Sequence, residues 1–429
     1  MAAAIATAFL FARALSAGAP EAPVRVEVPA SRLESPRLQA LKRKALPPQR
    51  FWDEVRRQGA PLLEPATDPR YDLVTFLWRD DGRTGSVFIL GNIGNTVGMT
   101  RLAGTDVWYR SYRIRKDARF NYRLAPHKGA DLDPARPADR DKIRETARLD
   151  PLNPRRYPPG DAPFMSIVEL PGAPPQPWIA RRPAALAGKV WDDTVRSAYL
   201  QGNRPVTVYT PAGYEDGGPP RPLLIVLDGS AYRDIIPLPT ILDNLSAEKR
   251  ITPPVAVLVG QLDAPERESD LGCNPAFTRF LAQELLPWVR SRYRVAAAPA
   301  STVLVGSSFG GLGAACAAVD RPDLFGNLLV QSGSFWWKPE GAHRWEWMTR
   351  QLAARPKLPL RLALDVGLLE TWPAEETGPS ILASNRRLRD VLRRKGYEIS
   401  YKEFAGGHAH ASWQVSLPDD LMFLLRPGR

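Results

Sequence analysis

One stretch of this 429-residue chain constrains the fold more than any other, and it reads Val303-Leu304-Val305-Gly306-Ser307-Ser308-Phe309-Gly310-Gly311-Leu312-Gly313-Ala314. A short apolar run leads through Gly-x-Ser-x-Gly into small helix formers, which is the pattern of a strand, a sharp turn and a helix called a nucleophile elbow. The central serine of such a turn is strained, and only glycine on either side leaves room for the chain that passes close by. The stretch therefore predicts an exposed nucleophile at Ser308.

The same turn predicts half of an oxyanion hole. The amide N–H of Phe309 stands at the start of the helix, where the helix dipole favours the negative charge of a tetrahedral intermediate. A second donor is expected from the loop after an earlier strand. The run Asp228-Gly229-Ser230-Ala231 is placed in this way, and the amides of Ser230 and Ala231 are both candidates.

The second half of the chain has the pattern of an α/β domain. From Gly188 onward, apolar runs that suit buried strands alternate with runs that suit helices, which indicates a parallel sheet covered on both faces. We expect an α/β-hydrolase with a first hairpin at 194–200 and 205–210, further strands at 222–229, 254–260, 303–305, 328–332, 360–367 and 398–404, helices at 278–293 and 380–395, and a closing helix.

The first half predicts a smaller antiparallel β-sandwich of immunoglobulin-like type, preceded by a helical stretch. Short β-rich runs lie at 73–78, 86–90, 106–113 and 119–124. A helix from Ser35 to Gly59 is expected before them, with a break at Pro47-Pro48. Proline cannot join a central ladder, so the proline-rich residues 126–183 are expected to form an ordered wrap or a linker. We therefore divide the chain into 1–34 (leader or disordered segment), 35–185 (sandwich and connection) and 186–429 (hydrolase).

The charge of the chain bears on its partners. A net charge of +12 and a pI near 9.8 favour acidic partners. No nucleic-acid motif is present, and beyond the first residues no apolar run approaches the ~20 residues that span a bilayer, so neither nucleic acid nor a membrane is expected as a partner. Residues 1–19 are rich in Ala but lack a basic start, and they stay open between a degenerate export signal and a tail.

The cysteines and histidines are few. Cys273 and Cys316 can form at most one bridge and lack the spacing of zinc ligands, and we interpret Cys316 as a small buried residue on the helix after Ser308. Four histidines leave little material for a metal site, and a catalytic base must come from among them: His127, His343, His408 and His410.

A serine hydroxyl needs a neighbouring base to take its proton, and His408 is the best candidate. It follows the last predicted strand in Ala405-Gly406-Gly407-His408. Loops after the strands of such a sheet gather at one edge, where the elbow also lies, and the glycines allow the loop to reach it. The rival is His410, which lies nearer the closing helix.

The triad acid should follow an earlier strand, which leaves two candidates. Asp365 lies inside the apolar run 360–367, whereas Glu370 lies in the loop beyond its end. A loop position allows a carboxylate to reach the imidazole more easily. We therefore prefer Glu370 and keep Asp365 as the alternative.

Motifs in both halves resemble one known family, the enterochelin (enterobactin) esterases. In the second half these are Asp228-Gly229, Cys273-Asn274, Gly306-Ser307-Ser308-Phe309-Gly310-Gly311-Leu312, Gln331-Ser332-Gly333-Ser334-Phe335-Trp336-Trp337 and Gly406-Gly407-His408. In the first half they are Phe51-Trp52, Phe76-Leu77-Trp78-Arg79, Ala103-Gly104-Thr105-Asp106-Val107-Trp108 and Asp150-Pro151-Leu152-Asn153-Pro154. The resemblance runs from about Ser35 to the C-terminus.

The resemblance implies hydrolysis of the serine esters of a ferric catecholate siderophore, an enterobactin-like cyclic triester, to release iron. Ser308 and His408 match the family's nucleophile and base, and Glu370 matches its acid. Arg267 and Arg110 lie in stretches that could meet the anionic complex, and Trp336 and Trp337 could stack on catechol rings. We expect no bound cofactor, since ferric iron arrives with the substrate, and a monomer or weak homo-oligomer.

Two alternatives stay open. A serine esterase of the same fold could act on feruloyl, acyl-glutathione or lipid esters, or the chain could bind a siderophore without catalysis. The expected location is cytoplasmic, with the periplasm as the alternative if residues 1–19 act as a signal peptide.

Overall fold

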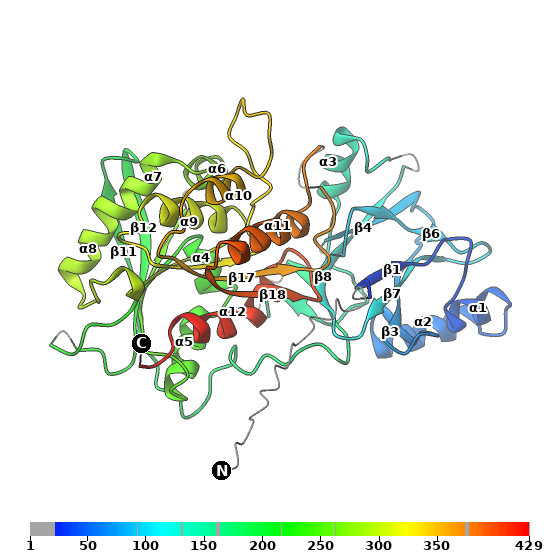
Figure 1. Ribbon diagram of the computed structural model, residues 1–429. Helices are drawn as coiled ribbons and strands as arrows, with labels where there is room; N and C mark the ends of the chain where they lie inside the picture. Colours follow the sequence, from blue (N-terminus) through cyan, green and yellow to red (C-terminus); the bar gives the residue numbers. More distant parts are fainter. Residues whose placement is uncertain are drawn as a thin grey trace, which may run out of the picture.

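The computed structural model describes residues 22–91, 93–129, 132–159, 164–215, 217–261, 263–373 and 377–428. They form two parts that lie side by side, a β-sandwich built by the first part of the chain and an α/β domain built by the rest (Figure 1). The predicted fold class, an α/β-hydrolase preceded by a smaller antiparallel sandwich, is confirmed. The predicted leader 1–19 lies outside the described residues.

The sandwich consists of two five-stranded antiparallel sheets. The first has the order β1-β7-β3-β2 with β6 beside β7, and its strands are β1 (Arg25–Glu27), β2 (Leu62–Pro65), β3 (Tyr71–Arg79), β6 (Thr100–Arg101) and β7 (Val107–Arg115). The second has the order β5-β4-β8-β10-β9, and its strands are β4 (Ser86–Gly91), β5 (Val97–Gly98), β8 (Arg119–His127), β9 (Arg156–Tyr157) and β10 (Met165–Glu169). Aromatic side chains fill the space between the sheets, with the rings of Phe76 and Tyr122 edge to face at 4.8 Å.

Two parts of the sandwich differ from the prediction. The sandwich begins before residue 35, because β1 pairs with β7 in its first sheet. The proline-rich stretch 126–183 is not only a connection, because β10 within it pairs with β8 in the second sheet. The stretch also contains α3 (Pro137–Glu145).

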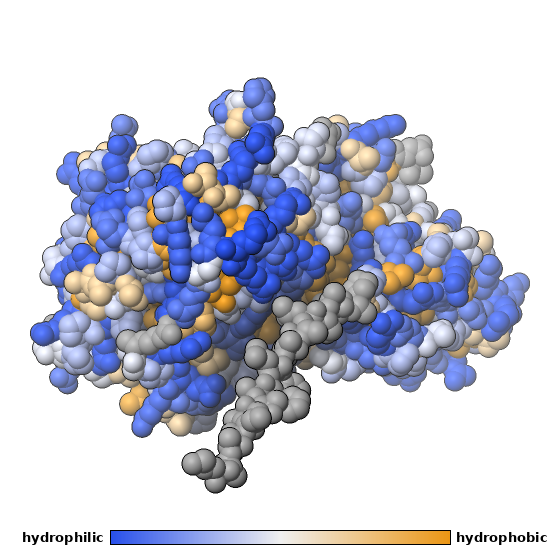
Figure 2. Space-filling view, in the orientation of Figure 1, coloured by the Kyte–Doolittle hydropathy of each residue, from blue (hydrophilic) through white to orange (hydrophobic). Residues whose placement is uncertain are grey.

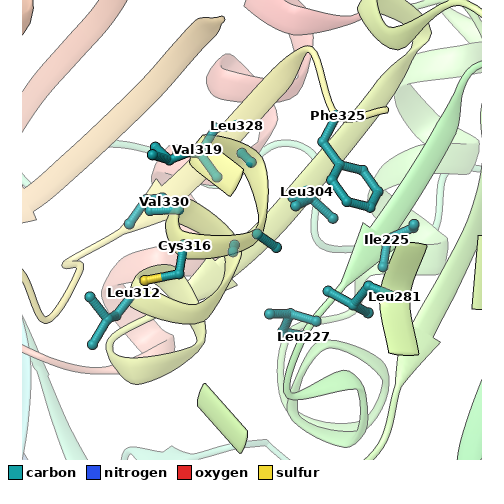
Figure 3. Packing of buried hydrophobic residues seen from close by; sticks show 14 of the residues in the cluster. Ile225, Leu227, Leu281, Leu304, Leu312, Cys316, Val319, Phe325, Leu328 and Val330 are labelled. Carbon is teal, nitrogen blue, oxygen red and sulfur yellow. The ribbon is translucent and has the colours of Figure 1, made fainter. Parts of the chain in front are cut away.

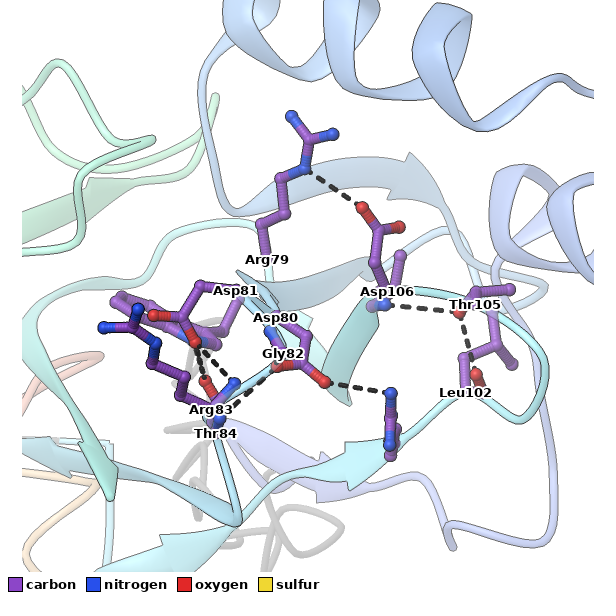
Figure 4. Close-up of polar contacts among 12 residues, drawn as sticks. Arg79, Asp80, Asp81, Gly82, Arg83, Thr84, Leu102, Thr105 and Asp106 are labelled. Carbon is purple, nitrogen blue, oxygen red and sulfur yellow. Dashed lines mark hydrogen bonds and ion pairs between the residues drawn. The ribbon is translucent and has the colours of Figure 1, made fainter. Parts of the chain in front are cut away.

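The expected N-terminal helix is two helices separated at the two prolines, α1 (Pro36–Lys42) and α2 (Pro48–Gln58). Ser35 caps α1 by accepting a hydrogen bond from Leu38 N at 3.3 Å. Trp52 of α2 donates its indole N–H to Asp106 at 2.9 Å. The carboxylate of Asp106 also pairs with Arg79 at 3.0 Å (Figure 4). This link attaches the helices to the end of β3.

The hydrolase domain is built on one eight-stranded sheet of order β11-β12-β14-β13-β15-β16-β17-β18. Its strands are β11 (Lys189–Ser197), β12 (Gly202–Thr210), β13 (Leu223–Val226), β14 (Val255–Val259), β15 (Thr302–Ser307), β16 (Asn327–Gln331), β17 (Arg361–Gly367) and β18 (Glu398–Phe404). The antiparallel hairpin β11-β12 stands at one edge, and from β14 to β18 all neighbours are parallel. Their carboxyl ends therefore meet at one edge of the sheet.

Helices cover both faces of this sheet. They are α4 (Gly229–Asp234), α5 (Leu238–Ala247), α6 (Ala264–Leu271), α7 (Pro275–Arg279), α8 (Leu286–Arg292), α9 (Phe309–Asp320), α10 (Trp347–Ala354), α11 (Ile381–Arg394) and α12 (His410–Leu424). A π-helical turn, Phe280–Leu285, joins α7 to α8, so the expected helix 278–293 belongs to a longer helical run. In Figure 1 α11 and α12 lie on opposite faces of β17 and β18.

The main core lies between α9 and the face of the sheet that this helix covers. Leu304, Leu328 and Val330 of the central strands pack there against Leu312 and Cys316 of α9 (Figure 3). A second cluster on the opposite face includes Trp413 and Leu417 of α12. The outer surface in the view of Figure 2 is mostly hydrophilic, with apolar residues in scattered groups.

A disulfide joins Cys273, just before α7, to Cys316 of α9. Cys316 is buried, as expected, and the one bridge that the sequence allows is formed. The bridge ties the nucleophile helix to the segment that follows α6.

We predict that replacing both cysteines by alanine lowers stability. The bridge closes a sequence separation of 43 residues, for which the chain-entropy relation gives ~4 kcal/mol. The melting temperature of the Cys273→Ala/Cys316→Ala variant, measured without reductant, should therefore fall by several degrees. A melting temperature equal to that of the wild type, with both proteins mass-verified, would contradict the bridge.

Candidate active site

The predicted elbow is present at the end of β15. Ser308 has φ 55° and ψ −122°, a strained conformation, and α9 begins at the next residue. A Cβ on Gly306 would overlap the backbone of Gly310, and a Cβ on Gly310 would lie 2.7 Å from Asp228 Oδ2. Both glycines are therefore required by close approach, as the motif predicts.

The structure brings Glu370 and His408 together. His408 Nδ1 lies 2.7 Å from Glu370 Oε2. The second oxygen, Oε1, accepts hydrogen bonds from Ser332 Oγ at 2.6 Å and from Gly367 N at 2.7 Å. Because the glutamate is completely buried, these donors are what stabilises its charge. With Nδ1–H donating to the carboxylate, Nε2 of His408 is left as the acceptor.

The other candidate acid, Asp365, lies in a different environment. It is fully buried, and Oδ2 accepts hydrogen bonds from Gln331 Nε2 at 3.0 Å and from Ser416 Oγ of α12. Burial raises the pKa of Asp365 to about 6 and also raises that of the neighbouring Asp420, whose Oδ1 lies 3.5 Å from Lys402 Nζ. Asp365 thus belongs to a buried polar cluster under the site, and Glu370 is the carboxylate that meets the imidazole.

Ser308 and His408 line the same cavity, whose volume is about 430 Å³. No hydrogen bond joins them directly; Ser308 Oγ instead lies 3.4 Å from the hydroxyl of Ser334. Hydrogen bonds of catalytic groups are often loose before substrate binds, so this geometry is compatible with His408 as the base.

The cavity also contains the predicted oxyanion loop, and the structure distinguishes its two candidates. The amide of Ala231 already donates to Asp228 O at 3.0 Å. The amides of Ser230 and Phe309 make no hydrogen bond within the described part of the chain. Ser230 and Phe309 therefore remain as the pair of possible donors.

Arg267 of α6 lines the cavity as well, as a substrate-binding residue would. Its Nε and Nη2 each lie 2.6 Å from a carboxylate oxygen of Asp228. This bidentate pair fixes the side chain and leaves Nη1 outside it.

His410, the rival base, lines the cavity without meeting the acid. Its ring packs edge to face on Trp413 at 5.1 Å. Burial, and then the neighbouring His408, lower the pKa of His410 to about 4, so it is neutral at pH 7. Of the two histidines, only His408 bonds to Glu370.

Three other predicted binding residues do not line this cavity. Arg110 lies in the sandwich, where it bonds Glu27 at 3.1 Å. Trp336 is nearly buried and packs edge to face on Phe309 at 5.9 Å. Trp337 packs on Trp347 at 6.2 Å. Both tryptophans pack on other aromatic rings outside the cavity lining, so a stacking role for them, like a binding role for Arg110, has no support in this geometry.

Three further residues lie at the site that the sequence did not single out for a role: Ser332, Ser334 and Trp413. Ser332 and Ser334 follow the strand next to the elbow strand, and Trp413 lies in the first turn of α12. The available signal was a pair of serines at the carboxyl end of a central strand, in Gln331-Ser332-Gly333-Ser334.

The elbow and the His408–Glu370 pair at the carboxyl edge of this sheet define an ester hydrolase of the α/β-hydrolase fold. An Esterase family model matches residues 197–424, and the model described as enterochelin esterase, N-terminal, matches residues 73–179. The chain belongs to the enterochelin esterase family.

Relatives match along both domains. An iron(III) enterobactin esterase of Escherichia coli O6:H1 (strain CFT073) is 31% identical over 82% of this chain and 91% of the relative. An iron(III) salmochelin esterase of the same strain is 27% identical over 87% of this chain and 93% of the relative. The crystal structure of the enterobactin esterase FES from Shigella flexneri in the presence of enterobactin superposes with a TM-score of 0.71 at 27% identity, covering 88% of this chain and 98% of that one.

We predict that mutation distinguishes the catalytic role of Glu370 from the structural role of Asp365. Glu370→Gln should lower kcat by roughly 10³-fold or more, because an amide N–H facing Nδ1 selects the wrong imidazole tautomer. Asp365→Asn should leave kcat within about threefold, since Asp365 does not touch the imidazole. Steady-state hydrolysis of p-nitrophenyl acetate measures both, and the reverse ranking would make Asp365 the acid.

We predict in addition that Asp365 makes stability pH-dependent. Its folded pKa of about 6 lies above that of an unfolded aspartate, so the folded state holds the extra proton and stability falls as the pH rises from about 4 through 6. Urea unfolding at pH 5 and 7.5 should show a smaller loss in Asp365→Asn than in the wild type, and equal losses would contradict the assignment.

Proposed function

We propose that this esterase hydrolyses the serine ester bonds of a ferric catecholate siderophore and so loosens the iron for release. The observation that carries the proposal is the buried Glu370 bonded to His408 in a cavity shared with Ser308 and Arg267. The substrate class is supported by the relatives, named enterobactin and salmochelin esterases, which match along both domains.

The first half-reaction transfers an acyl group to Ser308. Ser308 Oγ leaves Ser334 and attacks the ester carbonyl carbon while His408 Nε2 takes its proton, and Glu370 stabilises the imidazolium. The amides of Phe309 and Ser230 donate to the oxyanion. As the intermediate collapses, the carbon–oxygen bond to the leaving serine breaks, and His408 returns the proton to that oxygen.

The second half-reaction releases the product. Water loses a proton to His408 as it attacks the acyl-enzyme, the bond to Ser308 Oγ breaks, and the proton returns to the serine. His410 stays neutral because of its lowered pKa and does not compete for the proton.

Charge supports an anionic substrate. A ferric tris-catecholate carries a net negative charge, and the chain has a net charge of +12. Arg267 lines the same cavity as the nucleophile, and its side chain is held by Asp228. In this proposal iron enters only with the substrate, and no resident cofactor takes part.

Among the described helices none has the length and apolar character of a membrane span.

We propose the cytoplasm as the location of the protein, with the periplasm as the alternative. The prediction of a cytoplasmic protein came from the family resemblance, whereas the Cys273–Cys316 bridge supports the alternative of an oxidising compartment such as the periplasm, because disulfides rarely persist in the cytosol.

We predict that Ser308→Ala abolishes cleavage of the ferric triester. Removing the nucleophile should lower turnover by roughly 10⁶-fold, to the residual level that binding and the oxyanion hole provide. Mass analysis of the products after incubation with the ferric and iron-free triesters provides the measurement. Undiminished cleavage by Ser308→Ala would contradict acyl transfer.

The same assay tests the alternatives. A clear preference of the wild type for feruloyl or short p-nitrophenyl esters over the ferric triester would favour an esterase with another substrate. Failure of a fluorophosphonate probe to label Ser308 in folded protein would favour a binding protein without catalysis.

A further inference from the structure

Ser332 lies directly after β16 and beside the triad acid. Its backbone has φ 49°, and its side chain is completely buried. Its hydroxyl lies 2.6 Å from Glu370 Oε1, 38 residues away in the chain. None of the catalytic steps above uses it.

A second contact fixes the direction of this hydrogen bond. Trp413 Nε1 lies 2.9 Å from Ser332 Oγ, and an indole N–H can only donate. Ser332 Oγ therefore accepts from the indole, and its single O–H is free to donate to Glu370. The indole thus orients the hydroxyl toward the carboxylate.

Trp413 also contacts the base. Its ring meets the His408 ring edge to face, with centroids 5.0 Å apart and an interplanar angle of 85°, and it meets His410 at 5.1 Å and 83°. One indole therefore orients the donor to Glu370 Oε1 and limits how the imidazole at Oε2 can tilt.

We propose that Trp413 and Ser332 are positioning residues that act as a directional relay, in which the indole N–H orients the Ser332 hydroxyl and the hydroxyl holds Glu370 so that Oε2 faces His408. The proposal rests on the triad proposed above and extends it to two residues outside it. A buried carboxylate that lost this donor would keep only Gly367 N at Oε1 and would be free to turn away from the imidazole.

The relay makes a quantitative prediction about two variants. Ser332→Gly, which suits the positive φ, should lower kcat on p-nitrophenyl acetate by about 10- to 100-fold, the effect of one lost hydrogen bond to a buried charge. Trp413→Phe keeps an aromatic ring next to the histidines but lacks the N–H, and it should lower kcat by about fivefold. KM should change by less than about twofold in Ser332→Gly, because Ser332 does not line the cavity, whereas Trp413 does and is judged on kcat alone.

The double variant tests whether the two residues act in series. If Trp413 acts through the Ser332 hydroxyl, Ser332→Gly/Trp413→Phe should have nearly the kcat of Ser332→Gly alone. Three outcomes would each overturn the relay. They are a double variant in which the two single losses in kcat multiply, an unchanged kcat in Ser332→Gly, and an effect of Ser332→Gly on KM alone.

Two controls separate the relay from general damage. Ser384→Ala removes another fully buried serine hydroxyl, one that donates to Ile381 O, and should leave kcat unchanged. The downfield ¹H NMR signal of a carboxylate-bonded imidazole N–H reports the Glu370–His408 bond without any substrate. It should be present in the wild type, absent in Glu370→Gln and weakened in Ser332→Gly.

The outcomes distinguish the relay from the function on which it rests. A wild type that lacks the N–H signal and does not react with p-nitrophenyl acetate would contradict the triad itself. A normal signal in Ser332→Gly together with unimpaired turnover would leave the triad standing and refute the relay alone. Cleavage of the siderophore does not enter either comparison.

Discussion

The site depends on one buried carboxylate. Glu370 is removed from water completely, which is very unfavourable for a charge unless polar partners surround it. The structure supplies them from separate elements: Gly367 at the end of β17, Ser332 after β16, and His408 in the loop after β18. Parallel strands make this convergence possible, because their carboxyl ends meet at one edge of the sheet. The order of the strands therefore decides which residues can form the triad.

The sandwich contributes to the same arrangement. Leu369, next to the acid, and Ala405, before the histidine loop, pack into the core of the sandwich. Arg119 N of β8 donates to Ala405 O at 2.9 Å, and Leu369 N donates to Gly406 O at 2.9 Å. The acid loop and the histidine loop are thus bonded to each other and held against the second sandwich sheet. The first domain is therefore part of the support of the active site.

Local patterns in the sequence were sufficient for the parts of the site that lie at strand ends. Ser308, His408 and Glu370 each follow a recognisable strand, and loop position alone ranked Glu370 above Asp365. The roles that the sequence could not reveal depend on side-chain direction or on distant contacts. Trp336 lies in a motif next to the site yet points into the core, and the bond from Trp413 to Ser332 spans 81 residues. Strand β10 was missed because the prolines around it dominate the local composition.

The elbow and the predicted substrate contact share one charged pair. Asp228 ends the segment after β13 in a left-handed conformation, with φ 56°, and its carboxylate is buried between Gly310 of α9 and Arg267 of α6. The absence of a side chain at Gly310 is what admits the carboxylate. The carboxylate in turn holds the arginine in the cavity that the nucleophile lines, and the backbone carbonyl of Asp228 accepts the Ala231 amide, which leaves the Ser230 amide as the possible oxyanion donor. Gly310 is thus needed twice, for the turn that exposes Ser308 and for the Asp228 carboxylate that holds Arg267.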